Sequence, residues 1–361
     1  MERIHRAMLL TVPGIGSVKL RQMVDYFGDA QTAWGSKNQE LTESGILNSK
    51  ELAGLLNLRE RTDAAEISKK WTLSGIRCCS MEDPEYPPLL RQIFDPPPLL
   101  FFRGRVQPGA LCFAVVGSRQ STPYGRNVAH SFSEKLSRCG VTIVSGAATG
   151  IDTSAHEGAL AAGAATVAVL GCGVDIAYPR ANAQLLAHIA ANGCVISEYP
   201  PGTPPKPGQF PARNRIVAGM SVGVLVVEAA EKSGALITAD LALSENRDVY
   251  AVPGSVFSEH SRGTHRLIQQ GARLVGSAEE LLEALGFAVS GSSPSTDDLT
   301  PKEKRVLQEL SYSEPTALDT LVTKLTMEAS EITVILLRLE MEGHVWKNSC
   351  VGYSRVAKES V

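Results

Sequence analysis

The chain has 361 residues, of which 43% are hydrophobic and 20% charged, and its formal net charge is −3 at pH 7. This length fits two or three domains, and the composition excludes wholesale disorder. Because the chain has no net positive charge, any contact with nucleic acid must come from a local basic patch.

The seven cysteines have the spacing of neither a zinc site nor a disulfide framework, so we expect no metal. They are interpreted as reduced, mostly buried residues of a cytoplasmic protein. The stretch 158–174, which is among the longest without a charged residue, is rich in glycine and alanine and ends in a turn. A helix end followed by a buried strand explains it better than a membrane span, so no membrane contact is expected.

Residues 1–65 carry apolar side chains at helical spacing, which predicts a small helical domain. The run Pro13-Gly14-Ile15-Gly16 is a helix-hairpin-helix pattern, whose turn can point backbone N–H groups at a phosphate. Only Lys19 and Arg21 stand nearby as cations. We therefore favour a protein-contact module over a phosphate site.

Residues 66–286 are predicted to form the main domain. Its first part, 66–110, is a proline-punctuated connector with a strand near 99–102. From 111 onward, continuous apolar runs alternate with segments long enough for crossover helices. This pattern predicts a doubly wound, mostly parallel, Rossmann-like α/β sheet, because strands covered on both faces lack polar alternation. The strand candidates are 111–116, 141–145, 166–170, 195–198, 222–227 and 249–252.

A Ser/Gly/Pro-rich linker is predicted over 287–299, followed by a C-terminal domain over 300–361. Thr300-Pro301-Lys302-Glu303 has a helix-capping signature, and three short helical patterns precede a hairpin. Three helices and a hairpin are typical of a winged helix. With eight basic and nine acidic residues over 301–361, it lacks the surface of a DNA reader and is interpreted as a protein-contact module.

Three strand ends carry candidate binding loops, because open α/β sheets bind ligands beyond the carboxyl ends of their strands. After the first, Gly117 permits close approach of a ligand, Ser118 offers a hydroxyl and Arg119 a guanidinium for a phosphate. After the second come Gly146 and Gly150. Near them, Asp152 either caps the next helix or contacts a ligand. His156 is interpreted as a packing or hydrogen-bonding residue, since no metal partner stands near it.

The third loop follows the strand that ends at Glu228. There Ser233, Gly234 and Thr238 open a helix and fit a phosphate cradle. Glu228 could serve a nucleotide hydrolase as an acid or base, but no second carboxylate stands at an obvious spacing.

The proline-rich stretch 200–211 is predicted to be irregular and to lead into a further cluster of candidate residues. Phe210, Arg213, Asn214 and Arg215 put an aromatic face, two guanidinium groups and an amide into one loop. That combination suits a stacked base beside a bound phosphate. The alternative is that Phe210 belongs to the core and Asn214 caps the next helix.

Two nucleotide-binding patterns are absent from the sequence. There is no G-x-x-x-x-G-K-[ST] P-loop, which excludes ATP hydrolysis by that route. There is also no G-x-G-x-x-G. Gly171-Cys172-Gly173 begins like this motif, but Ile176 stands where the third glycine belongs. We therefore expect no dinucleotide and no other cofactor.

Taken in order, these motifs resemble the DprA/Smf family of DNA-processing proteins over about 85–276. The matching runs are Tyr86-Pro87, Val116-Gly117-Ser118-Arg119, Pro123-Tyr124-Gly125, Ser145-Gly146, Gly150-Ile151-Asp152, Ala155-His156, Tyr178-Pro179, Ser197-Glu198, Phe210-Pro211, Arg213-Asn214-Arg215, Ser233-Gly234, Arg247-Asp248-Val249, Val252-Pro253-Gly254, Leu267-Ile268 and Gly271-Ala272. Two positions depart from the family pattern. Ala147 stands where leucine is usual, and His265 replaces an asparagine.

The resemblance implies a homodimer that binds single-stranded DNA without turnover and helps to load RecA recombinase onto it in natural transformation. It places the DNA at Arg119, Phe210, Arg213 and Arg215, and Lys206 lies near a position where the family often has a DNA-contacting lysine. Two alternatives stay open. One is a phosphoribohydrolase-like enzyme, against which the missing Gly-Gly of that group's loop argues. The other is an interaction scaffold with a vestigial pocket.

Overall fold

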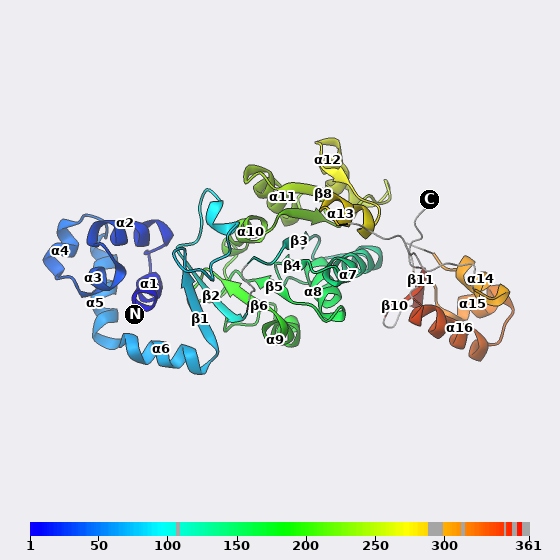
Figure 1. Cartoon of the computed structure of the whole chain (residues 1–361), viewed down its shortest axis with the longest axis horizontal. Helices are drawn as coiled ribbons and strands as arrows, with labels where there is room; N and C mark the ends of the chain where they lie inside the picture. Colours follow the sequence, from blue (N-terminus) through cyan, green and yellow to red (C-terminus); the bar gives the residue numbers. More distant parts are fainter. Residues whose placement is uncertain (106–108, 288–298, 312–314, 343, 349–351, 356–361) are drawn as a thin grey trace.

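The computed structural model describes residues 1–105, 109–287, 299–311, 315–342, 344–348 and 352–355 (Figure 1). Most of the linker predicted over 287–299 and one of the seven cysteines, Cys350, lie outside these residues. Of the other cysteines, five are buried and free, whereas Cys139 is exposed. No helix in the described ranges is long and apolar enough to cross a membrane, and no group of metal-ligating side chains occurs there.

Six helices precede the first strand, as the apolar spacing predicts. They are α1 (Glu2–Thr11), α2 (Ser17–Phe27), α3 (Ala30–Gly35), α4 (Asn38–Glu43), α5 (Ser49–Arg61) and α6 (Ala64–Leu73). The Glu51 side chain packs against the Gly14 turn between α1 and α2, since a Cβ added to Gly14 would lie 2.5 Å from Oε1 of Glu51. Glu51 also pairs with Lys19. Glu51 thus occupies the space beside the turn and engages the nearby Lys19, and the protein-contact role of these helices stays a prediction.

One nine-stranded sheet forms the centre of the molecule, in the order β1-β2-β6-β5-β4-β3-β7-β8-β9. The strands from β6 to β9 in this order run parallel, whereas β1 and β2 form antiparallel pairs at one edge. The predicted doubly wound, mostly parallel α/β sheet is thereby confirmed. The strands are β1 (Ile76–Ser80), β2 (Leu99–Gly104), β3 (Cys112–Val116), β4 (Thr142–Ser145), β5 (Thr166–Val169), β6 (Cys194–Ser197), β7 (Gly223–Val226), β8 (Asp248–Ala251) and β9 (Arg273–Leu274).

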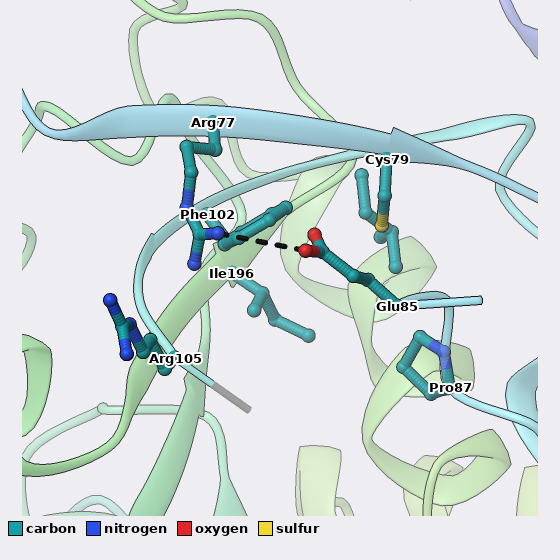
Figure 2. A pocket seen from close by; sticks show the side chains of 8 residues that line it. Arg77, Cys79, Glu85, Pro87, Phe102, Arg105 and Ile196 are labelled. Atoms are coloured by element: carbon teal, nitrogen blue, oxygen red, sulfur yellow. Dashed lines mark ion pairs between the residues drawn. The ribbon is translucent and has the colours of Figure 1, made fainter. Parts of the chain in front are cut away.

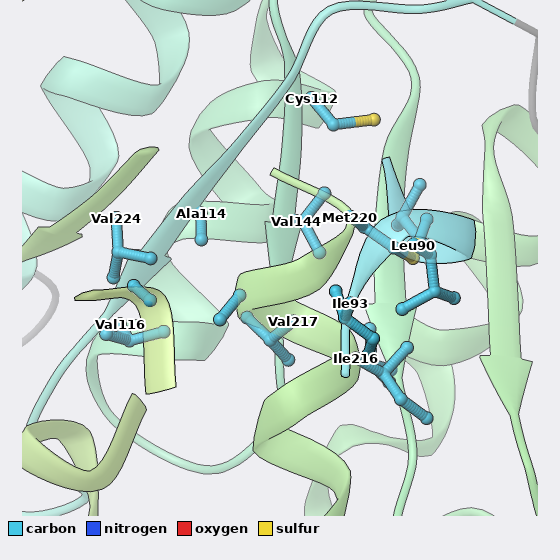
Figure 3. Close-up of a cluster of buried hydrophobic side chains, with 14 of the residues drawn as sticks. Leu90, Ile93, Cys112, Ala114, Val116, Val144, Ile216, Val217, Met220 and Val224 are labelled. Carbon is cyan, nitrogen blue, oxygen red and sulfur yellow. The ribbon is translucent and has the colours of Figure 1, made fainter. Parts of the chain in front are cut away.

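Helices cover both faces of this sheet. On one face lie α10 (Gln209–Gly219), α11 (Gly234–Ser244) and α12 (Arg262–Gln269), and Figure 3 shows Ile216 and Val217 of α10 packed towards strand residues such as Val116. The other face carries α7 (Pro123–Arg138), α8 (Ile151–Ala161) and α13 (Ala278–Ala284). Further along that face, α9 (Ala183–Asn192) and α1 pack on β2, β5 and β6. Short 3₁₀ turns fall at Leu90–Gln92, Arg180–Asn182 and Glu259–Ser261.

The strand order reverses direction between β3 and β7. From β3 the chain winds outward through β4, β5 and β6, and it then returns to β7 on the other side. The crossovers therefore diverge above this point and leave a crevice at the carboxyl ends of the two strands.

At the antiparallel edge, register aligns Arg77 of β1, Phe102 of β2 and Ile196 of β6 in one row (Figure 2). The outer side of β1 is covered by side chains. Arg3 donates to the carbonyl of Cys78, and the N–H of Ser80 donates to the Asp83 carboxylate. Such blocking protects an edge strand from pairing with another chain.

The C-terminal part contains the three helices and the hairpin that the sequence predicts. They are α14 (Pro301–Gln308), α15 (Leu318–Leu325), α16 (Ala329–Met341), β10 (Val345–Asn348) and β11 (Gly352–Arg355). Thr300 and Glu303 form the predicted capping box. The ring of Trp346 lies 4.4 Å from that of His130 on α7, so the winged helix touches the main domain. The division into 1–65, 66–286, 287–299 and 300–361 remains our proposal.

Gly104 offers a test of how tightly the edge strands are built. Its φ is +91°, and an added Cβ would lie 2.2 Å from the carbonyl oxygen of Gly193. Gly140 has φ +86° but open space around its Cβ position. We expect Gly140→Ala to lower the free energy of unfolding by about 1–2 kcal/mol through backbone strain alone. Gly104→Ala should lower it by about 2 kcal/mol more because backbone must move. Urea unfolding of both variants measures the difference, and equal losses would contradict it.

Candidate functional site

The crevice between β3 and β7 holds a cavity of about 560 Å³. Its walls are the loops after β3, β4 and β7 and the first turns of α10 and α11. Most of the residues predicted from the sequence line it, and only Gly150, Lys206 and Arg215 do not. The predicted residues in the wall are Gly117, Ser118, Arg119, Gly146, Phe210, Arg213, Asn214, Ser233, Gly234 and Thr238.

The loop after β3 is held in place from two sides. The N–H of Ser118 donates to the carbonyl of Glu228 at 2.8 Å, and the Ser118 carbonyl accepts from the N–H of Ile151 at 3.2 Å. Gly117 must be a glycine here, because a Cβ would lie 2.6 Å from the Ile151 side chain. This anchored backbone presents Arg119 as an exposed side chain at the rim of the cavity.

Gly150 supports this loop from below instead of lining the cavity. It precedes α8 as the N-cap with φ +85°, and a Cβ there would lie 2.4 Å from the Ser118 carbonyl oxygen. Asp152 therefore does not cap the helix, and that alternative interpretation is wrong. Its carboxylate instead accepts from the N–H of Ala148 at 3.1 Å and lies in the cavity wall.

Arg213 is buried beneath the cavity. Its guanidinium donates to the carbonyl of Gly146 at 2.5 Å and to the carbonyl of Val169. Burial lowers the pKa of Arg213 to about 10, opposed by the charge of Asp152, so Arg213 stays protonated at neutral pH. Burial likewise raises the pKa of the Asp152 carboxyl, and the charge of Arg213 opposes that rise. A Cβ added to Gly146 would lie 2.7 Å from the Arg213 guanidinium and 2.7 Å from the Asp152 carboxylate. Any side chain at this position would therefore displace these two groups.

The prediction that 210–215 form a loop is wrong, because α10 begins at Gln209. Phe210 is partly exposed in the cavity wall, 5.3 Å from the ring of Tyr178, with the Arg119 guanidinium 5.5 Å above its own ring. It is thus not a core residue. Asn214 lies inside α10 and donates to the carbonyl of Gly234, 3.4 Å away, so it joins α10 to α11 and caps neither.

Two predicted cations lie outside the cavity. Arg215 makes a two-pronged ion pair with Glu198, with both N–O distances 2.7 Å, and a further contact with Asp95 at 3.4 Å. Its charge therefore stabilises the junction of α10 with the connector. Lys206 is exposed in the loop before α10.

Glu228 is buried at the end of β7, where it holds the start of α7. Its carboxylate accepts from the N–H of Thr122 at 2.9 Å and from the Thr122 hydroxyl. A Cβ on Gly125 would lie 2.3 Å from the same carboxylate. Because both oxygens of Glu228 are engaged in this cap, the residue is not placed to transfer a proton to a ligand.

The loop after β7 adds a cation that the sequence analysis missed. Lys232 is exposed and lines the cavity beside Ser233, which caps α11 by accepting from the N–H of Ala235. In the sequence, Lys232 is the only lysine or arginine between the end of β7 and Thr238. This position directly before the predicted phosphate cradle could have identified it as a candidate. Among the described residues, no carboxylate forms an ion pair with Arg119 or Lys232, although Arg119 lies within the electrostatic reach of Asp152 in the same cavity wall.

Two histidines have structural roles. His156 is fully buried with Nδ1 2.8 Å from the Thr166 hydroxyl, and burial lowers its pKa to about 3, which confirms its interpretation as a packing residue. His265 places Nε2 3.1 Å from the Gly254 carbonyl and 3.4 Å from its nitrogen. The histidine thus holds the Val-Pro-Gly loop after β8 where the family pattern has asparagine.

Known proteins resemble this chain over most of its length. Residues 77–286 match the family model of the DNA recombination-mediator protein A, and 290–346 match that of the DprA winged helix domain. Protein Smf of Synechocystis sp. is 34% identical over 387 residues, 95% of this chain and 96% of its own. DNA processing protein DprA of Streptococcus pneumoniae is 44% identical over 228 residues, covering 62% and 79% respectively.

Solved structures agree with the sequence comparison. The X-ray structure of DprA from Streptococcus pneumoniae has a TM-score of 0.66 at 37% identity and covers 78% of this chain and 97% of its own. The structure of DNA processing protein A from Helicobacter pylori, which concerns the single-stranded DNA binding mode of that protein, has a TM-score of 0.53 at 31% identity. It covers 58% and 95% of the two chains.

The buried charges beneath the cavity generate a stability prediction. Asp152→Asn leaves the Arg213 guanidinium without its neighbouring negative charge, which should lower the free energy of unfolding by on the order of 3 kcal/mol. The double variant Asp152→Asn with Arg213→Met removes both charges and should be more stable than Asp152→Asn alone. Chemical denaturation of the single and double variants measures this. Equal or lower stability of the double variant would contradict the coupling.

Proposed function

Because the chain belongs to the DprA/Smf family of DNA recombination-mediator proteins, we propose that it binds single-stranded DNA in the β3–β7 cavity without turnover. The observation that carries the proposal is the stacked pair of Arg119 and Phe210 at the cavity rim. An aromatic face beside a guanidinium that forms no ion pair suits a base next to its phosphate.

The rest of the cavity wall fits the same ligand. Lys232 supplies a second cation, and the N-terminus of α11 adds partial positive charge at Ser233 and Gly234. Ser118 offers a hydroxyl group, whereas Thr238 lines the cavity as a buried residue. We assign direct contacts to the exposed members of this wall. Arg213, Gly146 and Gly150 shape the cavity, and Arg215 acts through the connector.

The absence of turnover is supported by how the carboxylates are used. A phosphoribohydrolase-like reaction requires an acid or base that reaches the ligand. Glu228 is engaged with Thr122. Asp152 lies in the cavity wall, but its carboxylate is held by the N–H of Ala148 and by the charge of Arg213. A ribose-release assay on nucleoside monophosphates should therefore detect no product, whereas steady release would revive the enzyme hypothesis.

We propose RecA loading in natural transformation as the cellular role, in keeping with the family. Its test is whether the protein speeds RecA assembly on a strand already covered by a single-strand-binding protein.

We also propose that two copies pair through the sheet domain. The uncharged run 235–237 in α11 is a candidate for the contact surface, but it does not support this pairing, because Ile237 lines the cavity. The edge strand β9 does support the pairing, since its Leu274 is 48% exposed. If the copies pair there, Leu274→Asp should sediment as a monomer.

We propose that the winged helix contacts protein and not DNA. Its net charge is −1 over 301–361, and α16, the helix that would read DNA, exposes Val334, Leu337 and Met341. An apolar stripe at helical spacing is typical of a protein-contact face. A chain that ends near Ser290 should bind oligonucleotides as tightly as the full chain, and a large loss of affinity would refute this.

The function is tested by comparing single-stranded with duplex DNA. A cavity that takes a base needs that base unstacked and accessible, and the described basic residues form no groove-reading helix. Oligo-dT should therefore bind clearly more tightly than a duplex of equal length in a gel-shift or anisotropy titration. Equal affinity for the two forms would contradict the proposal.

Arg119 and Phe210 should contribute to DNA binding by different physics. Arg119→Ala should weaken binding and flatten the slope of log affinity against log salt by about 0.7 for a single strand, because one phosphate contact is lost. Phe210→Ala should cost on the order of 1–3 kcal/mol through lost stacking and leave the slope unchanged. Salt titrations of the two variants, with thermal melts beside them, measure both effects.

A matched control for charge is Arg138→Ala, at the opposite end of α7 from the cavity. It should leave both the affinity and the salt slope as they are. An unaltered slope for Arg119→Ala, or a lowered melting temperature for Phe210→Ala, would remove the corresponding assignment.

A further inference from the structure

A second cavity, of about 240 Å³, opens over the antiparallel edge of the sheet (Figure 2). It lies over β1, β2 and β6, away from the β3–β7 crevice, and shares no lining residue with the first cavity. The chemistry proposed above makes no use of it.

The floor of this cavity is apolar. Phe102, Leu100 and Ile196 come from β2 and β6, and the thiol of Cys79 comes from β1. All four are buried residues. Burial raises the pKa of the Cys79 thiol to about 12, so the floor carries no charge at neutral pH.

Two arginines stand at the rim of this floor. The Arg77 guanidinium lies 4.6 Å from the Phe102 ring centre and donates to the carbonyl of Gly104 at 3.0 Å. Arg105 follows directly, and its own N–H donates to the carbonyl of Gly193 at 2.8 Å. Arg77 belongs to β1 and Arg105 follows the end of β2, and Figure 2 shows the two side chains on one side of the cavity.

Glu85 stands across from them and is only loosely held. Its carboxylate lies 3.7 Å from Arg77, and both side chains are about half exposed. Such surface pairs contribute little to stability, so another carboxylate can replace Glu85 with little loss. Among the described residues, no carboxylate forms an ion pair with Arg105. The rim therefore carries one more positive than negative charge.

These features select the ligand. A cavity of this size is smaller than the roughly 300–1,000 Å³ typical of sites for whole small molecules, and it suits one aromatic side chain. A nucleobase has several polar atoms along its edge, and the apolar floor offers them no partner. A phenylalanine side chain has no such need, and carboxylates beside it would meet the two guanidinium groups.

We propose that this cavity binds an acidic segment of a partner protein by taking up a phenylalanine side chain between Arg77 and Arg105. The segment attaches through this side chain and its flanking carboxylates. It does not add a strand to the sheet, because Arg3 and Asp83 block the outer edge of β1. The main DNA cavity stays free while the segment is bound.

The test uses the full chain and a fluorescein-labelled peptide of four aspartates followed by a C-terminal phenylalanine. Fluorescence anisotropy at low salt should show saturable binding. Replacing the phenylalanine of the peptide by alanine should weaken binding at least about tenfold, because the buried ring is lost. Replacing the aspartates by asparagines should also weaken it several-fold, and added salt should remove that difference.

The protein variant Arg105→Glu reverses one rim charge on an exposed side chain and should weaken the acidic peptide about fivefold or more. Arg61→Glu, which makes the same charge change at the end of α5, is the matched control and should have no effect. If Arg105→Glu lowers the melting temperature, Arg105→Gln replaces it and should give a smaller loss in the same direction.

Saturating oligo-dT should leave peptide binding unchanged, since the two cavities share no residue. Displacement of the peptide by oligo-dT would overturn the proposal in favour of a nucleic-acid site. Equal binding of the phenylalanine and alanine peptides, or equal effects of Arg105→Glu and Arg61→Glu, would also overturn it. None of these results depends on whether Arg119 and Phe210 bind DNA.

Discussion

The buried guanidinium of Arg213 is the constraint around which the β3–β7 cavity is built. A charge without water must receive hydrogen-bond acceptors and an opposite charge, and the carbonyls of Gly146 and Val169 and the nearby Asp152 provide them. These groups belong to the ends of β4 and β5 and to α8. Because α10 must bring Arg213 to this one place, its rotation and height over the sheet are determined.

The position of Phe210 follows from that constraint. It precedes Arg213 by three residues, nearly one helical turn, and so lies on the same side of α10. There its ring meets the Arg119 guanidinium, which the loop after β3 presents. That loop is itself fixed by backbone hydrogen bonds to Glu228 and Ile151. The two exposed binding groups thus come from separate elements, and buried polar contacts set the distance between them.

The sequence predicted the sheet well and the site in part. Continuous apolar runs identified the central strands because both of their faces are covered, but β1 and the two-residue β9 have no such run. The prolines around 200–211 suggested a loop. Pro211 nevertheless fits the first turn of α10, where a backbone N–H has no partner in the helix to lose. With that helix unrecognised, Arg213 and Arg215 looked equivalent. Two residues apart on a helix, they face opposite ways, one into the sheet and one towards Glu198.

The small number of free cations constrains how the protein can hold a strand. Among the described residues that line the β3–β7 cavity, only Arg119 and Lys232 are exposed cations, and one phosphate contact from each gives a salt slope of about 1.4 per copy for a single strand. Stacking on Phe210 adds on the order of 1–3 kcal/mol for one base. Neither term alone produces tight binding at physiological salt. If two copies pair as proposed, a strand that spans both cavities binds the second one intramolecularly, and the two modest contributions multiply. Pairing would then strengthen the proposed DNA binding, because a net charge of −3 gives the chain no general attraction to DNA that could compensate for weak contacts.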